Sequence, residues 1–230
     1  ADLTAVGYQA LAANTNGTCN AAVGYVALGA NTTGAYNTAV GYQALDANTE
    51  ADFNTAFGYN ALGSITGGGV EVCAQNTAVG YGALASTTSS TTSTAVGCNA
   101  LTSCTSTNNN TAVGMDALKL SNGTQLTALG RSAGSNLTGG NHCTYIGYGS
   151  AGSAVSVEYE LVIGCEATTG KGGKTGFINA NGESTNGSIY QGDNSSTWST
   201  TSDERIKKNI VDSTIGLAEI NQIQVRNFEY

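Results

Sequence analysis

The stretch T-A-V-G-Y-Q-A-L occupies residues 38–45, and the same eight letters stand at residues 4–11. Close variants recur along most of the chain, each built around one glycine. These ten glycines are Gly7, Gly24, Gly41, Gly58, Gly80, Gly97, Gly114, Gly130, Gly147 and Gly164. They are 17 residues apart, except for 22 before Gly80 and 16 before Gly130. Such an array is typical of a solenoid, in which each unit is one coil that buries its apolar face only against neighbouring units.

The residues of each unit indicate strands rather than helices. Seventeen residues are too few for a helix-turn-helix repeat, and T-A-V-G-Y is short, β-branched and bounded by Asn, Thr and Gly. We therefore predict an all-β fold, a parallel β-solenoid or β-roll of about ten 17-residue coils. The long interval predicts a five-residue insertion (22 − 17) within residues 64–76, which include three successive glycines.

Alternation along the strand predicts two faces for each coil. The residues one and three before each glycine share one face, and we expect that face to point inward. The expected inward series is Val6, Val23, Val40, Phe57, Val79, Val96, Val113, Leu129, Ile146 and Ile163. The opposite face carries mainly Ala and Gly, and its small side chains would permit close approach of another chain on a symmetry axis.

A tyrosine follows the glycine in six units, and stacking would align these rings into a column at ~4.8 Å spacing. Two interpretations of this column remain open. An exposed column could bind sugar rings. A column packed inside the coil, or at a subunit interface, agrees better with its replacement by Cys98 and Met115.

Charge and motif content exclude several classes of site. The net charge is −8 and no Lys or Arg precedes Lys119, which argues against nucleic-acid partners. No apolar run of about 18 residues predicts membrane insertion. His142 is the only histidine, and the six cysteines lack C-x-x-C spacing, so we expect no metal site. The run G-K-G-G-K-T at residues 170–175 lacks the glycine that a phosphate loop needs, and we expect no cofactor.

The cysteines are expected to be free thiols or isolated loop disulfides. Cys98 and Cys104 are close enough in sequence to bridge across a turn.

As an array, the repeat resembles the T-A-V-G-Y-Q-A-L arrays of phage and marine viral tail-fibre proteins. It is more distantly similar to the S-V-A-I-G coils of trimeric autotransporter adhesin heads. The resemblance implies a threefold homotrimer with a β-roll shaft over residues 1–168. The last two units depart from the pattern, which predicts that the coil ends or repacks there. Tyr145 and Val162 replace the alanine, and Gly134, Ala151 and Thr168 replace the leucine.

Residues 169–201 are rich in Gly, Ser, Thr and Asn, with the short apolar groups Phe177-Ile178 and Ile189-Tyr190. We interpret them as a β-rich neck. Residues 202–230 would then begin a further domain.

That domain opens with T-T-S-D-E-R-I-K-K-N-I at residues 200–210, which resembles the entry to the self-cleaving intramolecular chaperone of endosialidase tailspikes. The resemblance implies one cut at the Thr201–Ser202 bond. Ser202 would be the nucleophile and Lys207 its base, and a lysine amine with a lowered pKa can serve in that role. Asp203, Arg205 and Asn209 complete the pattern in supporting roles.

We therefore expect a structural segment of a virion tail fibre that displays loops for host attachment. It would assemble in the host cytoplasm and be extracellular after release. Its partners would be its own copies, other tail or virion proteins and a host-surface glycan or protein receptor. No external substrate is expected.

Other hypotheses are a bacterial trimeric adhesin head, an ice- or surface-binding repeat protein using the threonine row, and a capsule-degrading enzyme. The ice-binding hypothesis needs that row on an exposed face, whereas its place beside valine predicts an inward or edge position. Against the enzyme, the repeats contain no recurring pair of carboxylates.

Overall fold

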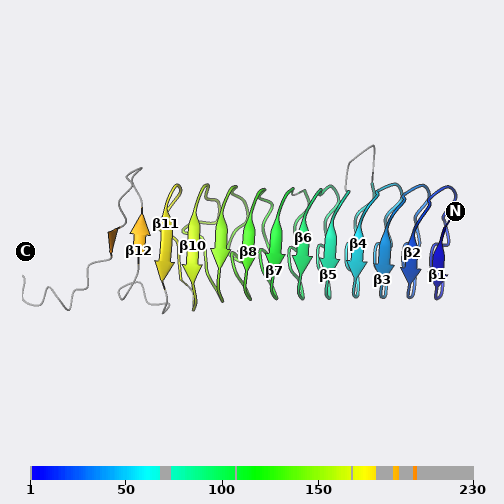
Figure 1. Ribbon diagram of the computed structural model, residues 1–230, viewed down its shortest axis with the longest axis horizontal. Coiled ribbons are helices and arrows are strands. Elements are labelled where there is room, and N and C mark those ends of the chain that lie inside the picture. Colours follow the sequence, from blue (N-terminus) through cyan, green and yellow to red (C-terminus); the bar gives the residue numbers. More distant parts are fainter. Residues whose placement is uncertain are drawn as a thin grey trace, which may run out of the picture.

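The structure, a computed structural model, describes residues 2–67, 74–106, 108–166 and 168–179, together with the strands at 189–191 and 199–200. It is an elongated stack of coils, each of which contributes one short strand to a single sheet (Figure 1). Ten strands belong to the repeats: β1 Thr4–Val6, β2 Ala21–Val23, β3 Thr38–Val40, β4 Thr55–Phe57, β5 Thr77–Val79, β6 Thr94–Val96, β7 Thr111–Val113, β8 Thr127–Leu129, β9 Thr144–Ile146 and β10 Leu161–Gly164. The predicted β-solenoid of about ten coils is confirmed.

Neighbouring strands are parallel, and equivalent residues of successive repeats are paired directly. Thr38, for example, pairs with Thr55, and Ala39 with Ala56. The same register holds across the 22-residue interval, where Thr55 pairs with Thr77. Backbone hydrogen bonds between coils continue around the rest of each turn, as from Leu28 N to Ala44 O (3.0 Å). The extra residues in the long interval therefore do not interrupt the stack.

The interior of the coils is lined by the alanine of T-A-V, and the prediction that the valine series points inward is wrong. From β2 to β8 this alanine is fully buried in every strand, whereas Val6 is 57% exposed and Phe57 56%. The leucine four residues after each glycine explains the outcome. These leucines, such as Leu45 and Leu62, are also fully buried and fill the narrow interior, which leaves room only for a methyl group opposite them.

The repeats of Gly130 and Gly147 show the same constraint with the sizes exchanged. Gly134 replaces the leucine, and a Cβ atom added there would lie 3.2 Å from Cδ2 of Tyr145. Tyr145 replaces the alanine and is fully buried. The ring thus occupies volume that the leucine fills in other coils. This confirms the predicted change of packing at the end of the array.

Each coil turns sharply at residues in the left-handed region of backbone conformation. Leucines of the core row adopt it, with φ of 52° at Leu45 and 47° at Leu118, and so does the residue two after each glycine. Such φ values cost about 1–2 kcal/mol for residues other than glycine. The burial of the leucines, which orders the corner, offsets that cost.

A column of buried asparagines lies beside the alanine row. From the sequence alone, these asparagines are expected to be turn residues. Asn37 Nδ2 donates to Ala51 O (2.7 Å), and its Oδ1 accepts from Asn54 N (2.9 Å). Asn20, Asn54, Asn76 and Asn110 occupy the same position in their repeats and are also buried. Each amide therefore joins its own coil to the next and satisfies backbone groups that have no contact with water.

The sheet continues past the repeats. β11 (Gly176–Asn179) pairs with β10 in parallel, and β12 (Ile189–Gln191) and β13 (Ser199–Thr200) follow in antiparallel order. The apolar groups Phe177-Ile178 and Ile189-Tyr190 lie in β11 and β12.

Candidate functional site

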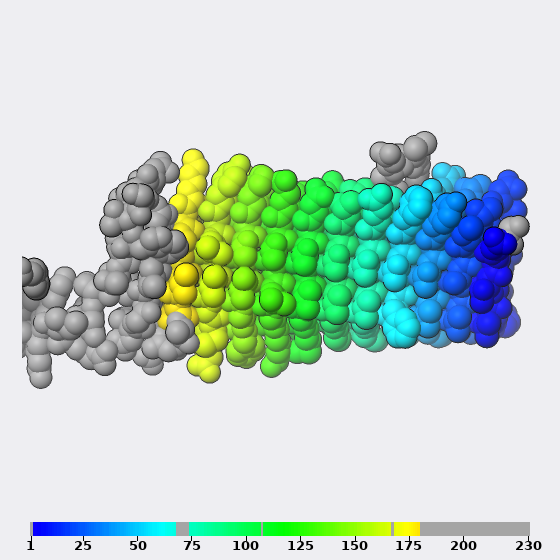
Figure 2. All heavy atoms as spheres, in the orientation of Figure 1, coloured from blue at the N-terminus to red at the C-terminus, as the bar shows by residue number. Residues whose placement is uncertain are grey.

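The outward side of the sheet is the largest regular surface of the chain. It consists of the first and third residues of β1–β10, and we call it the Thr/Val face. Figure 2 shows the side chains of successive coils aligned in rows along the rod. Thr38, Thr55 and Thr111 are exposed, and the other threonines of the row are exposed or half-buried. The interpretation that placed this row inward or at an edge is therefore wrong.

Two properties of the Thr/Val face bear on function. It carries no charged residue at any of its positions. One of its rows is apolar along its whole length, and Val6, Val23, Phe57 and Leu129 of that row are exposed. A contiguous apolar stripe of this kind marks a surface that contacts another molecule. The small Ala/Gly face, predicted as a symmetry contact, instead faces the coil interior.

The tyrosine column forms one long edge of the stack. Tyr8, Tyr25, Tyr42, Tyr59 and Tyr81 are stacked face to face, with ring centroids 4.9–5.1 Å apart. All five are exposed, from 43% for Tyr42 to 62% for Tyr8, so the reading that placed them inside the coil is wrong. Because each ring covers its neighbour, a ring inside the column presents only its edge to solvent.

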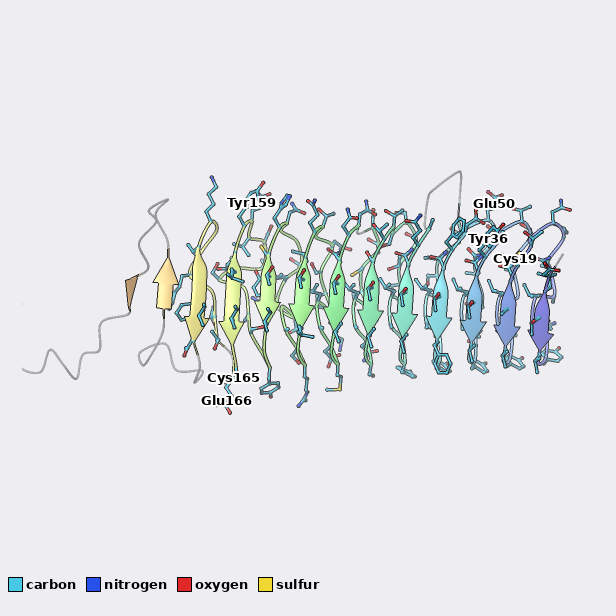
Figure 3. The ribbon with its side chains drawn as sticks, in the orientation of Figure 1. Cys19, Tyr36, Glu50, Tyr159, Cys165 and Glu166 are labelled. Carbon is cyan, nitrogen blue, oxygen red and sulfur yellow. The ribbon has the colours of Figure 1, made fainter. Side chains whose placement is uncertain are left out.

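Two further pairs of stacked rings lie at the opposite edge. Figure 3 shows Tyr36 and Tyr159 on one long side of the rod and Cys165 with Glu166 on the other. Tyr36 stacks on Phe53 at 5.0 Å, and His142 stacks on Tyr159 at 4.6 Å. His142 thus belongs to a stacked pair of rings at the surface.

The cysteines are dispersed through the coils. Cys98 is exposed in the tyrosine column, whereas Cys104 is buried and its Sγ donates to Ser121 O (2.7 Å). The structure shows no disulfide between them. Cys73 lies outside the described residues.

A cluster of ionisable groups is buried near the C-terminal end of the repeats. Tyr145 donates its hydroxyl hydrogen bond to Glu160 Oε2 (3.0 Å), and Ser153 N and Gly172 N donate to the same carboxylate (3.2 and 2.9 Å). Burial raises the pKa of the Cys143 thiol and raises that of Tyr145 far above its ordinary value. The carboxylate of Glu160 therefore joins the last coils to the loop that leads to β11.

The residues predicted to carry self-cleavage, Ser202, Lys207, Asp203, Arg205 and Asn209, lie outside the described residues. Within the described ranges, no three His, Cys, Asp or Glu side chains are grouped so as to hold a metal ion. No helix in that same part of the chain has the length and apolar character to cross a bilayer.

Comparison of the chain with protein-family models, curated proteins and solved structures finds no match. Inference about function therefore depends on the surfaces described above and on the sequence motifs.

Proposed function

We propose that this chain is a structural shaft segment of a viral tail fibre, and that it forms a parallel homotrimer through its Thr/Val face. The observation that carries the proposal is the uninterrupted, uncharged apolar row on the outside of a coil that is already fully packed inside. A rigid rod with one such stripe has the shape and the surface of a fibre subunit.

The energetics are compatible with self-association. Fully burying a valine side chain stabilises by about 1.5–3 kcal/mol, and the half-exposed row members would gain on the order of 1 kcal/mol each. Ten rungs together supply on the order of 10 kcal/mol per chain, comparable to the ~4–15 kcal/mol that association costs. Copies aligned in the same direction share the strand spacing, so each rung of one chain meets the equivalent rung of the next. The number three comes from the resemblance to viral fibres and adhesin heads.

The resemblance of residues 200–210 supports the viral assignment over a bacterial adhesin head, because the S-D-x-R-x-K-x-N-I pattern belongs to self-cleaving phage chaperones. On this proposal the segment from Ser202 assists trimer assembly and is then removed. The released fibre is a virion component that contacts other tail proteins and, through its loops, the host surface.

Native mass spectrometry tests the assembly. We expect three times the chain mass of 23.1 kDa. A persistent monomer would sink the proposal.

A second candidate, ice binding, is favoured by one observation: the threonine row lies on the outer side of the sheet, exposed or half-buried, with regular spacing. It uses the same face and therefore competes with trimer formation. Thermal hysteresis of the solution separates the two. A monomer that shows hysteresis, and loses it in Thr94→Leu, would support ice binding, and a trimer without hysteresis would support the fibre.

A further inference from the structure

The tyrosine column cannot offer ring faces to a ligand where it is continuous. Tyr25 is covered on one side by Tyr8 at 5.1 Å and on the other by Tyr42 at 4.9 Å, which leaves no room for another ring between them. A ring face becomes accessible only where the column is interrupted. Tyr148 is at such an interruption, with Arg131 before it and Cys165 after it in the column.

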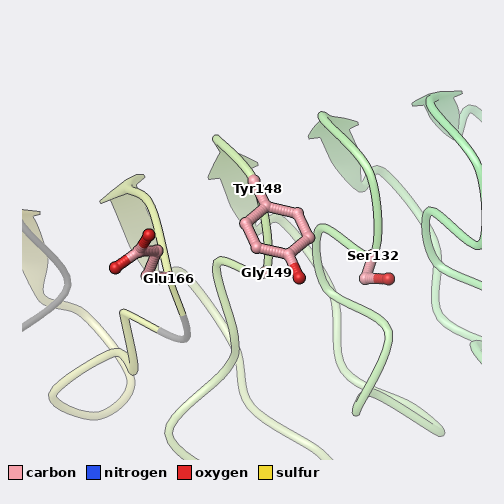
Figure 4. Close-up of a pocket in the computed structure, with 4 residues that line it drawn as sticks. All are labelled: Ser132, Tyr148, Gly149 and Glu166. Carbon is pink, nitrogen blue, oxygen red and sulfur yellow. The ribbon is translucent and has the colours of Figure 1, made fainter.

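The surroundings of Tyr148 are hollowed on the outside of the coil. Ser132, Tyr148, Gly149 and Glu166 line a surface pocket of about 400 Å³ (Figure 4), which is within the range of ~300–1,000 Å³ usual for ligand sites. Ser132, Gly149 and Glu166 all stand two residues after the repeat glycine. All earlier coils except that of Gly82 carry longer side chains there, including Gln9, Val26, Gln43 and Asp116. The pocket is present because the small residues Ser132 and Gly149 follow each other on successive coils.

The side chains around the pocket combine an aromatic ring with groups that form hydrogen bonds. The Tyr148 ring is 50% exposed, and the Arg131 guanidinium lies 5.6 Å from its centroid, which supports the ring from one side. Glu166 is exposed and supplies carboxylate oxygens, which accept hydrogen bonds, and Ser132 supplies a hydroxyl that donates or accepts. Figure 4 shows Tyr148 between Ser132 and Glu166.

We propose that this pocket binds a neutral pyranose sugar. The C–H groups of one sugar face would stack on the negative face of the Tyr148 ring, and Glu166 would accept hydrogen bonds from two neighbouring sugar hydroxyls. The negative charge of Glu166, on a chain of net charge −8, disfavours phosphate or carboxylate ligands. The pocket would be the binding site for the host-surface glycan of the proposed function. The sugar-binding proposal rests on that function only for its biological role.

The test is saturation-transfer NMR and calorimetry on the whole chain with a panel of methyl glycosides: glucoside, galactoside, mannoside and N-acetylglucosaminide. We expect at least one to bind at millimolar concentration. Tyr148→Ala and, separately, Glu166→Gln should each weaken that binding by about tenfold or more, a loss of ~1.4 kcal/mol. Tyr25→Phe is the control, because it changes a tyrosine whose two faces are already covered and keeps the column continuous, and it should bind as wild type does.

Binding by none of the four glycosides, binding unchanged in Tyr148→Ala and Glu166→Gln, or equal loss in Tyr25→Phe would overturn the assignment. Native mass measured on the same samples keeps the two proposals apart. A monomer that binds sugar contradicts the trimer alone, and a trimer that binds none contradicts the pocket alone.

Discussion

Gly97 shows how closely the backbones of successive coils approach one another. Its φ is 136°, and a Cβ added there would lie 2.6 Å from the carbonyl carbon and oxygen of Gly114 in the next coil. Backbone cannot move aside as a flexible side chain can. The glycine that defines the repeat in the sequence is therefore required by stacking as well as by its left-handed conformation.

We expect Gly97→Ala to destabilise the shaft by more than the ~1–3 kcal/mol typical of backbone strain alone. Gly172→Ala is the matched control, because Gly172 has a φ of 122° but no atom within 4 Å of the added Cβ. Urea denaturation of both variants measures the difference. Equal losses would show that conformation, and not contact between coils, selects the glycine.

The sequence predicted the number of coils and the spacing of the side-chain columns. It did not predict which face of each strand points into the coil interior. Period-two alternation separates two faces and does not say which is inside. The signal was present in the last repeats, where Tyr145 replaces alanine in the coil after Gly134 replaces leucine. Such an exchange of volume identifies two positions that share one interior. The buried asparagine column was missed because asparagine is also common in turns.

At the scale of the strand, adjacent residues of β5 have opposite roles. Ala78 is fully buried among the core residues, whereas Val79 belongs to the Thr/Val face and is half-buried in the single chain. One side of the strand therefore packs the coil, and the other is the side that would contact a partner in the proposed trimer.

Ala78→Asp should unfold the neighbouring coils, because an unpaired buried carboxylate costs about 3–5 kcal/mol. Val79→Asp should leave the chain folded and prevent its association. Circular dichroism and native mass spectrometry provide the two measurements, with Thr88→Asp, at an exposed loop position, as the neutral control. A folded Ala78→Asp chain would contradict the assigned interior, and a trimeric Val79→Asp chain the assigned interface.

The buried cluster at β9 and β10 makes the end of the shaft sensitive to alkaline pH. The pKa values of Cys143 and Tyr145 are raised in the folded chain above their ordinary values of 9.0 and 10.0. The unfolded chain therefore loses these protons first, and stability present below pH 9 falls as the pH rises further.

The free energy of unfolding from urea titrations should be level between pH 7 and 9 and decrease above that. Cys143→Ser removes the thiol ionisation, so its decrease should begin nearer the ordinary pKa of tyrosine, 10.0. A wild-type curve that stays level beyond pH 10 would contradict the effect of burial.

At the scale of the whole molecule, removal of the proposed chaperone segment would make assembly irreversible. Folding must bring Ser202 and Lys207 together before the nucleophile can be activated. Once the segment is lost, the trimer has no template for refolding, and its lifetime depends on the rate of unfolding.

A chain that carries an entire chaperone domain of this type from Ser202 onward should cut itself once, between Thr201 and Ser202. Ser202→Ala and Lys207→Ala should each give an uncut trimer. Intact-mass spectrometry is the measurement. A cut at another bond, or a wild-type chain that stays whole, would show that these two residues have been assigned wrongly.

The pairing of β4 with β5 across the 22-residue interval has an evolutionary consequence. The interval accepts five additional residues, and the strands on either side keep their register. Insertions and deletions in this interval can therefore occur without altering the stacked strands of the rod. A lineage can therefore change the length and sequence of this interval while it inherits the same scaffold, and a laboratory could insert a foreign peptide at the same place.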